Sequence, residues 1–413
     1  MTVHRAYIMK KRDKKLSKDI TPEGADIKKK HRRGLSKGKK IAISVILVLY
    51  AAVIAAVSFV VFYRPKIDQR KKVFIETVTD SDGRVVRVET VHNAIDGTYN
   101  ILLLGHDRAA MLTDVFMLVN VNNNDNTITV TQIPRDTWIS DNDGISIPTN
   151  KINAVFSTYY YSYYGSGESE DAAYKHALMS LTEMLEENLS IEISNSAIMD
   201  LDGFINIVDA LGGVEIDVPA AMTYYDPAQN LNINIPAGHQ TLNGAAAEGF
   251  VRYRAGYLTA DLGRQNAQKQ FLSALFSKVK STVSITNVSK LTELAGEISN
   301  NLVSDMSVGD LVYYAKNLLS CDLSSMNMMT IPGNLANSYY VINRAAARDV
   351  INASYNVYDK PITDGIFDTA GIFNCSWVYS MNEAYYLPAD QVYDNSVYNG
   401  QEISENPIEI PRH

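Results

Sequence analysis

The sequence is poor in the residues that hold transition metals. Among its 413 residues there are two cysteines, Cys321 and Cys375, and seven scattered histidines. None of them stands at the spacing that zinc ligands require, so a zinc enzyme has little support. With 46% hydrophobic and 20% charged residues, the chain is too apolar to be disordered throughout, and it is long enough for one large globular domain with appendages.

Charged residues are absent from one long segment, Ile41 to Tyr63, and are unevenly shared on its two sides. Residues 1–40 carry 15 Lys and Arg against 4 Asp and Glu, whereas the rest of the chain carries 23 against 42. At about 1.5 Å per residue, the uncharged apolar segment is long enough to cross roughly 30 Å of hydrocarbon. We therefore predict a transmembrane helix over 41–63 that separates two unlike compartments.

The orientation of this helix follows from the basic residues that precede it. Their concentration between Lys28 and Lys40 predicts a cytoplasmic N-terminus and places everything after Arg64 outside. There a disulfide between the two cysteines could persist, although sequence alone cannot pair them. A cleaved signal peptide is the alternative, but the apolar run is longer than an ordinary signal sequence and a long charged segment precedes it. Topology and anionic lipid headgroups explain the basic segment better than nucleic-acid binding does.

Beyond the membrane helix, the pattern predicts alternating strands and helices. Val73–Val78 and Val85–Val91 flank an Asp82-Gly83 turn and predict a hairpin that acts as a spacer. The later alternation predicts an α/β fold, an α/β/α sandwich with a central mixed sheet. Strands are expected at Tyr99–Leu104, Val115–Val121, Thr127–Ile133, Val214–Val218, Gly249–Arg254 and Met328–Ile331, and helices at Ala172–Asn188, Phe204–Leu211 and Arg264–Val279, with more helix over 285–320.

Arginines gather near one predicted strand and the helix after it. Side chains alternate along a strand, so Arg252 and Arg254 would project from one face. Two guanidinium groups side by side repel each other unless an anion such as pyrophosphate accepts hydrogen bonds from both. On the following helix, Asp261, Arg264 and Gln268 share a polar face. This junction predicts a polyanion site; the alternatives are surface arginines on a solvated strand and a solvated helix face.

Further charged residues stand at the ends of predicted strands, where open α/β sheets bind ligands. Asp107 follows one strand and Asp114 precedes the next, a pair of carboxylates that suits Mg²⁺ beside phosphate but is also compatible with simple turns. Arg135 ends another strand and Lys151 follows it; each is alternatively a surface charge. The tyrosine run over 159–164 is either an interfacial or glycan-stacking patch or ordinary loop packing.

Eight short motifs follow one another along the chain. They are Asn100-Ile-Leu-Leu-Leu-Gly-His-Asp107, Thr113-Asp114, Ile133-Pro-Arg-Asp136, Lys151-Ile-Asn153, Leu211-Gly-Gly-Val-Glu215, Leu242-Asn-Gly244, Val251-Arg-Tyr-Arg254 and Asp261-Leu-Gly-Arg-Gln265. In this order they resemble the LytR-CpsA-Psr family of cell-wall glycopolymer ligases over residues 97–283, and more weakly to 356. One departure is Leu112, which stands where family members usually carry an arginine; Arg108 lies a few residues upstream.

The resemblance implies roles for the residues singled out above. Asp107 and Asp114 match magnesium-binding carboxylates, and Asp261 matches a carboxylate that acts as a base or orients the arginines. The positions that match the binding site of a lipid-linked pyrophosphate are Arg135, Lys151, Arg252, Arg254, Arg264 and Gln268. Arg135, Arg252, Arg254 and Asp261 are therefore the expected catalytic residues.

The implied reaction transfers an anionic glycopolymer from a polyprenyl-pyrophosphate carrier to peptidoglycan through a phosphodiester. Its cofactor would be Mg²⁺, and the catalytic domain would lie outside the membrane of a Gram-positive-type bacterium. The alternatives are a membrane-anchored protein that binds the lipid-linked polymer without transferring it, and a pyrophosphatase that uses the same pocket. The expected organisation is a cytoplasmic segment (1–40), a membrane helix (41–63), a stalk (64–96), a catalytic domain (97–356, core 97–283) and a polar tail (357–413).

Overall fold

The computed structural model describes residues 71–79, 81–107, 111–140, 145–227, 231–254, 260–282, 288–321, 326–358, 360–362 and 373. The predicted cytoplasmic segment and membrane helix, Arg108, Cys375 and most of the predicted tail lie outside these residues. Within them, no helix combines the length and the hydropathy that crossing a membrane requires. All of them belong to one compact unit, Ala56–His413.

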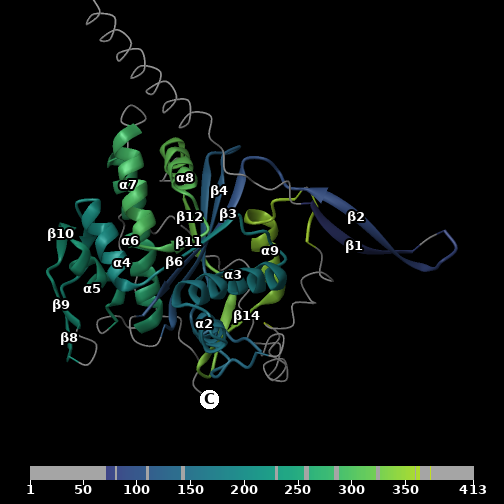
Figure 1. Cartoon of the computed structure of the whole chain (residues 1–413), viewed down its shortest axis with the longest axis horizontal. Coiled ribbons are helices and arrows are strands. Elements are labelled where there is room, and N and C mark those ends of the chain that lie inside the picture. The colour runs from purple at the N-terminus through teal and green to yellow at the C-terminus, as the bar shows by residue number, and fades with distance from the viewer. Residues whose placement is uncertain are drawn as a thin grey trace, which may run out of the picture. The chain divides into compact units, whose positions relative to one another are not determined.

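A six-stranded mixed sheet forms the centre of this unit (Figure 1). Its strand order is β11-β6-β3-β4-β5-β12. The β3-β4 and β4-β5 pairs are antiparallel, whereas β6 runs parallel to β3 and β12 runs parallel to β5. The strands are β3 (Thr98–His106), β4 (Thr113–Asn122), β5 (Thr127–Gln132), β6 (Asn195–Met199), β11 (Val303–Ser304) and β12 (Asn327–Thr330).

Helices cover both faces of the sheet, because the central strands are apolar on both sides. Alternate residues such as Leu102 and Leu118 pack against α2, α3 and α9, whereas Ile101 and Val119 pack against α6 and α8. The predicted α/β/α sandwich with a mixed sheet is therefore confirmed. The helices are α2 (Val155–Gly165), α3 (Glu170–Leu189), α4 (Leu201–Ala210), α5 (Gly244–Arg252), α6 (Ala260–Thr282), α7 (Val288–Asn300), α8 (Val308–Ser320) and α9 (Arg344–Ser354), with the short η1 (Ile152–Ala154) before α2.

Polar caps set where several of these helices begin. The Ser169 side chain accepts a hydrogen bond from Ala172 N at α3, and Asp200 caps α4 through Gly203 N. Ser307 and Asp310 form a reciprocal capping box at α8, which satisfies two backbone N–H groups that the first turn leaves without helical partners.

Small two-stranded sheets complete the fold. The predicted hairpin is confirmed: β1 (Lys71–Thr79) pairs with β2 (Val85–Asn93) in antiparallel register. β7 (Val214–Val218) pairs with β10 (Gly238–Leu242), and β8 (Met222–Asp226) pairs with β9 (Leu231–Ile235). These last four strands pack their apolar residues against α4, α5 and α6. β13 (Gly333–Ala336) pairs with β14 (Tyr339–Ile342).

One predicted strand is wrong: residues Gly249–Arg252 lie in helix α5. The Asn243 side chain accepts a hydrogen bond from Ala246 N at 2.9 Å and so caps the helix. Three alanines then follow, and alanine has the highest helix propensity of all residues. The chain becomes extended at Tyr253 (φ −61°, ψ 133°), so Arg252 and Arg254 do not share a strand face.

The close approach of α5 to α4 depends on Gly244. A Cβ at this position would lie 2.4 Å from the Ile205 carbonyl oxygen, a backbone atom that cannot rotate away. We expect Gly244→Ala to lower the free energy of unfolding by about 1–3 kcal/mol, the usual cost of overpacking. Thermal unfolding of the full chain measures this, with Gly296→Ala in α7 as the matched control. No atom lies within 4 Å of a Cβ at Gly296, so that variant should be no less stable than the parent; equal melting temperatures for the two variants would contradict the prediction.

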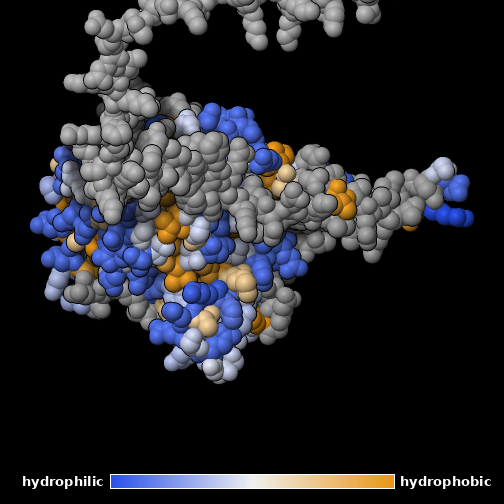
Figure 2. Space-filling view, turned by 45° about the horizontal axis from the view of Figure 1, so that its top comes forward, coloured by the Kyte–Doolittle hydropathy of each residue, from blue (hydrophilic) through white to orange (hydrophobic). Residues whose placement is uncertain are grey.

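Hydrophilic residues cover most of the described surface that faces the viewer in Figure 2, with apolar residues in small groups between them. Scattered apolar residues of this kind are normal on a protein surface. On the described surface in this view, no large apolar patch marks a binding face. The polar contacts at the ends of the central strands are the more informative feature.

Candidate functional site

The topology of the sheet gathers three of the candidate residues at one edge, where several strands end. β3, β5 and β12 run in the same direction, and β4 runs against them. Asp107 follows the last residue of β3, Asp114 is the second residue of β4, and Arg135 comes three residues after β5. The carboxyl ends of β3, β5 and β12 therefore share an edge with the start of β4, and ligands of α/β sheets bind at such edges.

A β-bulge positions the Asp114 carboxylate. Gly105 pairs with Val115 and His106 pairs with Thr113, so Asp114 is an extra residue in β4 without a partner in the ladder. Bulges bend a strand and redirect a side chain, and they are common beside active sites. Here the Arg135 guanidinium donates from Nη1 to Asp114 Oδ1 at 2.8 Å.

The ion-pair network continues from Arg135 to Lys151. Asp136 lies between them: its Oδ2 is 3.7 Å from Arg135 Nε, and its Oδ1 accepts from Lys151 Nζ at 2.8 Å. The Lys151 ammonium also lies 5.5 Å from the centre of the Tyr339 ring, a cation–π contact. Three of the residues predicted from sequence, Asp114, Arg135 and Lys151, thus belong to one network of partly exposed charges.

Asp107 lies on the neighbouring loop. Its backbone N–H donates to the Leu112 carbonyl at 3.0 Å, and its Oδ1 accepts from Leu112 N at 3.3 Å. The Leu112 side chain packs against the core, so position 112 itself supplies no cation; Arg108 lies outside the described residues. Among the described residues, no three His, Cys, Asp or Glu side chains cluster to form a ready-made metal site. Asp107 and Asp114 still fit Mg²⁺, which takes one or two protein carboxylates and completes its shell with phosphate and water.

The second group of candidate residues lies on α5 and α6. Arg252, the last residue of α5, donates from Nη1 to Glu248 Oε1 at 2.6 Å, and both side chains are mostly buried (20% and 12% exposed). Gln268 of α6 is buried, and its Nε2 contacts the Val251 carbonyl oxygen at 3.4 Å. This contact holds α6 against the end of α5, beside Arg252.

Burial excludes the solvated-helix-face interpretation of α6. Arg264 and Gln268 are only 3% and 7% exposed, although they lie on the face that the sequence marks as polar. Arg254 is partly exposed two residues beyond α5. Asp261 lies at the start of α6, and its side chain is outside what the structure describes.

Gln132 links the two groups, and the sequence analysis missed it. Its Nε2 donates to Gln268 Oε1 at 2.8 Å, which ties α6 to the end of β5, three residues before Arg135. Alternate residues of β5 face α6, and they are Ile128, Val130 and Gln132. The alternation predicts an apolar residue at position 132. The amide of Gln132 departs from that pattern and is the signal in the sequence that could have identified it. The bond therefore holds the α5–α6 group at the strand end that leads to Arg135.

Two further observations concern aromatic residues. The tyrosine run lies in helix α2, so the loop-packing interpretation was wrong; Tyr159 and Tyr160 are buried, whereas Tyr161 and Tyr164 are about half exposed. His106, just before Asp107, contacts the Tyr174 hydroxyl through Nε2, and burial raises the pKa of this tyrosine. Neither His106 nor Tyr174 was among the site residues predicted from the sequence.

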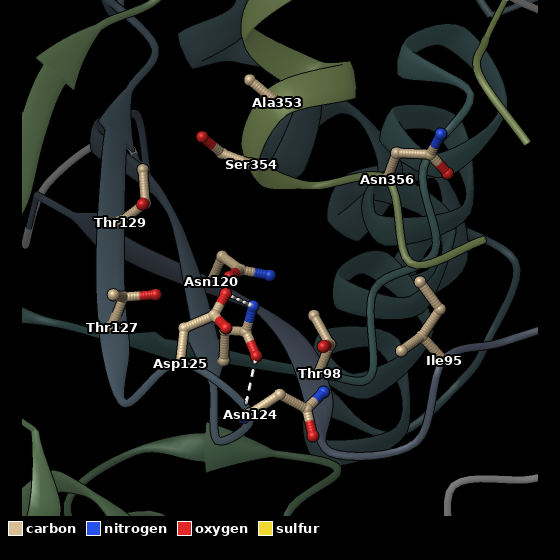
Figure 3. A pocket seen from close by; sticks show the side chains of 11 residues that line it. Ile95, Thr98, Asn120, Asn124, Asp125, Thr127, Thr129, Ala353, Ser354 and Asn356 are labelled. Carbon is tan, nitrogen blue, oxygen red and sulfur yellow. Dashed lines mark hydrogen bonds between the residues drawn. The ribbon is translucent and has the colours of Figure 1, made fainter. Parts of the chain in front are cut away.

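A cavity of about 280 Å³ opens at the opposite edge of the sheet (Figure 3). Amides and hydroxyls of residues such as Thr98, Asn120 and Thr127 line it, together with Ser354 at the end of α9. Thr98 and Thr127 begin β3 and β5, so the cavity is separated from Asp107 and Arg135 by the length of these strands. None of the candidate site residues lines it.

The match to a known family agrees with this arrangement. The sequence profile of the LytR_cpsA_psr family matches residues 67–356. The chain belongs to the LytR-CpsA-Psr family.

Among its named relatives is the cell wall biosynthesis protein LcpA of Corynebacterium glutamicum, which is 30% identical over 271 residues, 58% of this chain and 51% of LcpA. The polyisoprenyl-teichoic acid–peptidoglycan teichoic acid transferase TagV of Bacillus subtilis is 28% identical over 186 residues, 45% of this chain and 43% of TagV. The chain thus spans about half the length of these relatives. The crystal structure of B. subtilis TagV superposes with a TM-score of 0.46 at 20% identity, covering 70% of this chain and 98% of that structure.

Proposed function

We propose that this protein transfers an anionic glycopolymer from a polyprenyl-pyrophosphate carrier to peptidoglycan and forms a phosphodiester. The observation that carries the proposal is the Gln132–Gln268 bond, which ties α6 to the end of β5, three residues before Arg135 of the Asp114–Arg135–Lys151 network. Cations contributed by separate segments suit a ligand with two adjacent phosphates. The relatives named as teichoic acid transferases support the same class of reaction.

In the proposed reaction, a hydroxyl of the wall glycan attacks the phosphorus on the glycan side of the pyrophosphate. The bond from this phosphorus to the bridging oxygen breaks, and polyprenyl phosphate leaves with the electron pair. Arg135, Arg252, Arg254 and Arg264 stabilise the negative charge that grows on the leaving phosphate, and Lys151 and Gln268 orient it. Asp261 accepts the proton of the attacking hydroxyl, the role that the family resemblance implies.

Asp107 and Asp114 would hold Mg²⁺ in this proposal. When bound, the ion neutralises phosphate charge and orients the phosphoryl oxygens. Arg135 contacts Asp114 directly, so the guanidinium and the metal would act on the same phosphate. A membrane helix over 41–63, with the catalytic domain outside the cell, would keep the site beside a substrate whose tail stays in the bilayer.

A transfer assay with the full chain tests the proposal. The purified protein in detergent is incubated with lipid-pyrophosphate-linked glycan, peptidoglycan and Mg²⁺, and the covalent glycan–peptidoglycan product is measured. We expect product with Mg²⁺ and little with EDTA. Release of sugar phosphate without the acceptor would instead identify a pyrophosphatase. Lipid-linked glycan that binds but yields neither product would identify a binding protein, the alternative that Leu112 favours because it removes one expected phosphate contact.

A further inference from the structure

Lys269 is a buried cation at the candidate site that the mechanism above does not use. It follows Gln268 on α6 and is 5% exposed. Its Nζ donates a hydrogen bond to Thr330 Oγ1 at 2.9 Å. An ammonium group has three N–H donors, and within the described part of the chain this is the hydrogen bond it makes; no carboxylate there lies within ion-pair distance of it.

The neighbours of Lys269 form a buried polar cluster with unused hydrogen-bonding capacity. Thr330, the last residue of β12, pairs in register with Gln132, the last residue of β5. Gln132 donates to Gln268, yet its own Oε1 is buried with no hydrogen-bond partner among the described residues. We call Gln132, Gln268, Lys269 and Thr330 the strand-end cluster. Since buried polar atoms are nearly always paired, the unused N–H donors of Lys269 indicate a ligand that accepts hydrogen bonds.

Among the residues that the structure describes, no group of opposite charge contacts the Lys269 ammonium either. The members of the cluster that β5 and β12 contribute, Gln132 and Thr330, are neutral. Burial is the cause that lowers the pKa of Lys269 to about 8, and no charged group on a neighbouring element contributes to that shift. Lysine is almost never fully buried unless it is paired with an anion. The cluster lies at the carboxyl ends of β5 and β12, the edge that also carries Arg135, where the proposed ligand would bring phosphate oxygens.

We propose that Lys269 is an additional phosphate-binding residue, whose ammonium contacts the lipid-linked pyrophosphate together with the Gln268 amide. This inference rests on the proposed function. It makes lipid binding dependent on a proton, because a neutral amine must gain one before it can pair with phosphate. Below about pH 8 the Lys269 amine is already protonated, and binding is strong. Above pH 8 most of the amine is neutral, so Lys269 must take up a proton from solvent whenever the ligand binds, and binding weakens.

Calorimetric titration of the full chain in detergent with farnesyl pyrophosphate, a short polyprenyl pyrophosphate, tests this proposal. Between pH 7 and 9.5 we expect the affinity to fall by roughly thirtyfold, the factor expected for one group with a pKa near 8. At pH 9, titrations in two buffers of different ionisation enthalpy should show uptake of about one proton per ligand. Lys269→Met, similar in length but neutral, should bind at least tenfold more weakly at pH 7 and lose the pH dependence. Lys269→Arg should bind with an affinity that does not change over this pH range, because its guanidinium stays charged.

Two results would overturn the role of Lys269. The first is a Lys269→Met variant that binds with the affinity and pH profile of the parent. The second is binding by the parent without proton uptake. This second measurement uses the parent alone, so it does not depend on whether a variant folds. Failure of the proposed function has a different signature. In that case the parent does not bind farnesyl pyrophosphate at any pH, and the proposal for Lys269 falls with it.

Discussion

Replacing Asp114 by alanine is expected to reduce magnesium-stimulated transfer by about a hundredfold or more, since the charge stabilisation supplied by a metal ion is worth several kcal/mol. The bulge in β4 turns this carboxylate toward the edge where Asp107 and Arg135 lie. Without it, Mg²⁺ would keep one of its two expected protein ligands. The rate of glycan transfer as a function of Mg²⁺ concentration measures the effect, and we expect both a lower maximum and a higher concentration for half-stimulation.

The fold should tolerate this substitution. The Asp114–Arg135 ion pair is about a third exposed at the carboxylate (34%), and pairs of this kind contribute about 0–1 kcal/mol. Arg135 also keeps its contact with Asp136. Asp125→Ala is the matched control: Asp125 is exposed just beyond the other end of β4, where it accepts a hydrogen bond from Asn122. It should transfer glycan at the parent rate. Magnesium-independent transfer by Asp114→Ala at the parent rate would refute the metal-binding role.

The strands that position these residues were predictable, whereas the bulge was not. The apolar run Ile101–Leu104 in β3 and the Asn-rich turn between β4 and β5 are local signals, and β3 and β4 lie where the sequence placed them. The bulge depends on the register between Gly105 and Val115, which residues on two strands determine together. No pattern along β4 alone shows that Asp114 is an extra residue.

The error at α5 shows how a short segment misleads. Val251 to Arg254 alternates apolar or aromatic residues with arginines, which satisfies the rule for a strand. The decisive signals lie just before it: Asn243 as a cap, followed by three alanines. Glu248 and Arg252 are four residues apart, a spacing that places them side by side on a helix and apart on a strand. Reading the window from residue 243 would have favoured the helix.

Residues whose importance depends on distant partners were the hardest to predict. Gln132 and Lys269 each contact residues more than 60 positions away, Gln268 and Thr330 respectively. Sequence spacing therefore carries no sign of these contacts. The α6 helix itself was predicted, but its polar face was expected to be either solvated or a ligand site; burial of Arg264, Gln268 and Lys269 against the sheet became visible only in three dimensions.

Arg252→Ala is the second substitution with a large expected effect, because it would remove the proposed charge-assisted contact to the pyrophosphate. Such contacts contribute about 1.5–3 kcal/mol, so we expect a loss of roughly tenfold or more in transfer. The same substitution also removes an ion pair within α5, because the Arg252 guanidinium lies 2.6 Å from the Glu248 carboxylate. Glu248 is only 9% exposed. Part of any loss of activity could therefore reflect a less stable α5, and the measurement must separate the two effects.

Glu248→Gln provides that separation. It removes the charge of the partner but keeps the Arg252 guanidinium and a side chain of the same shape, so it should weaken α5 without removing the phosphate contact. We expect Glu248→Gln to retain transfer within about threefold while its melting temperature falls, since the amide oxygen can still accept from the guanidinium but the attraction between opposite charges in this mostly buried pair is lost. Arg252→Ala should lose both. If the two variants lost transfer equally, Arg252 would act by holding α5 together; if Arg252→Ala kept the parent rate, the guanidinium would not contact the pyrophosphate. A selective loss in Arg252→Ala fits only a guanidinium that binds the leaving phosphate.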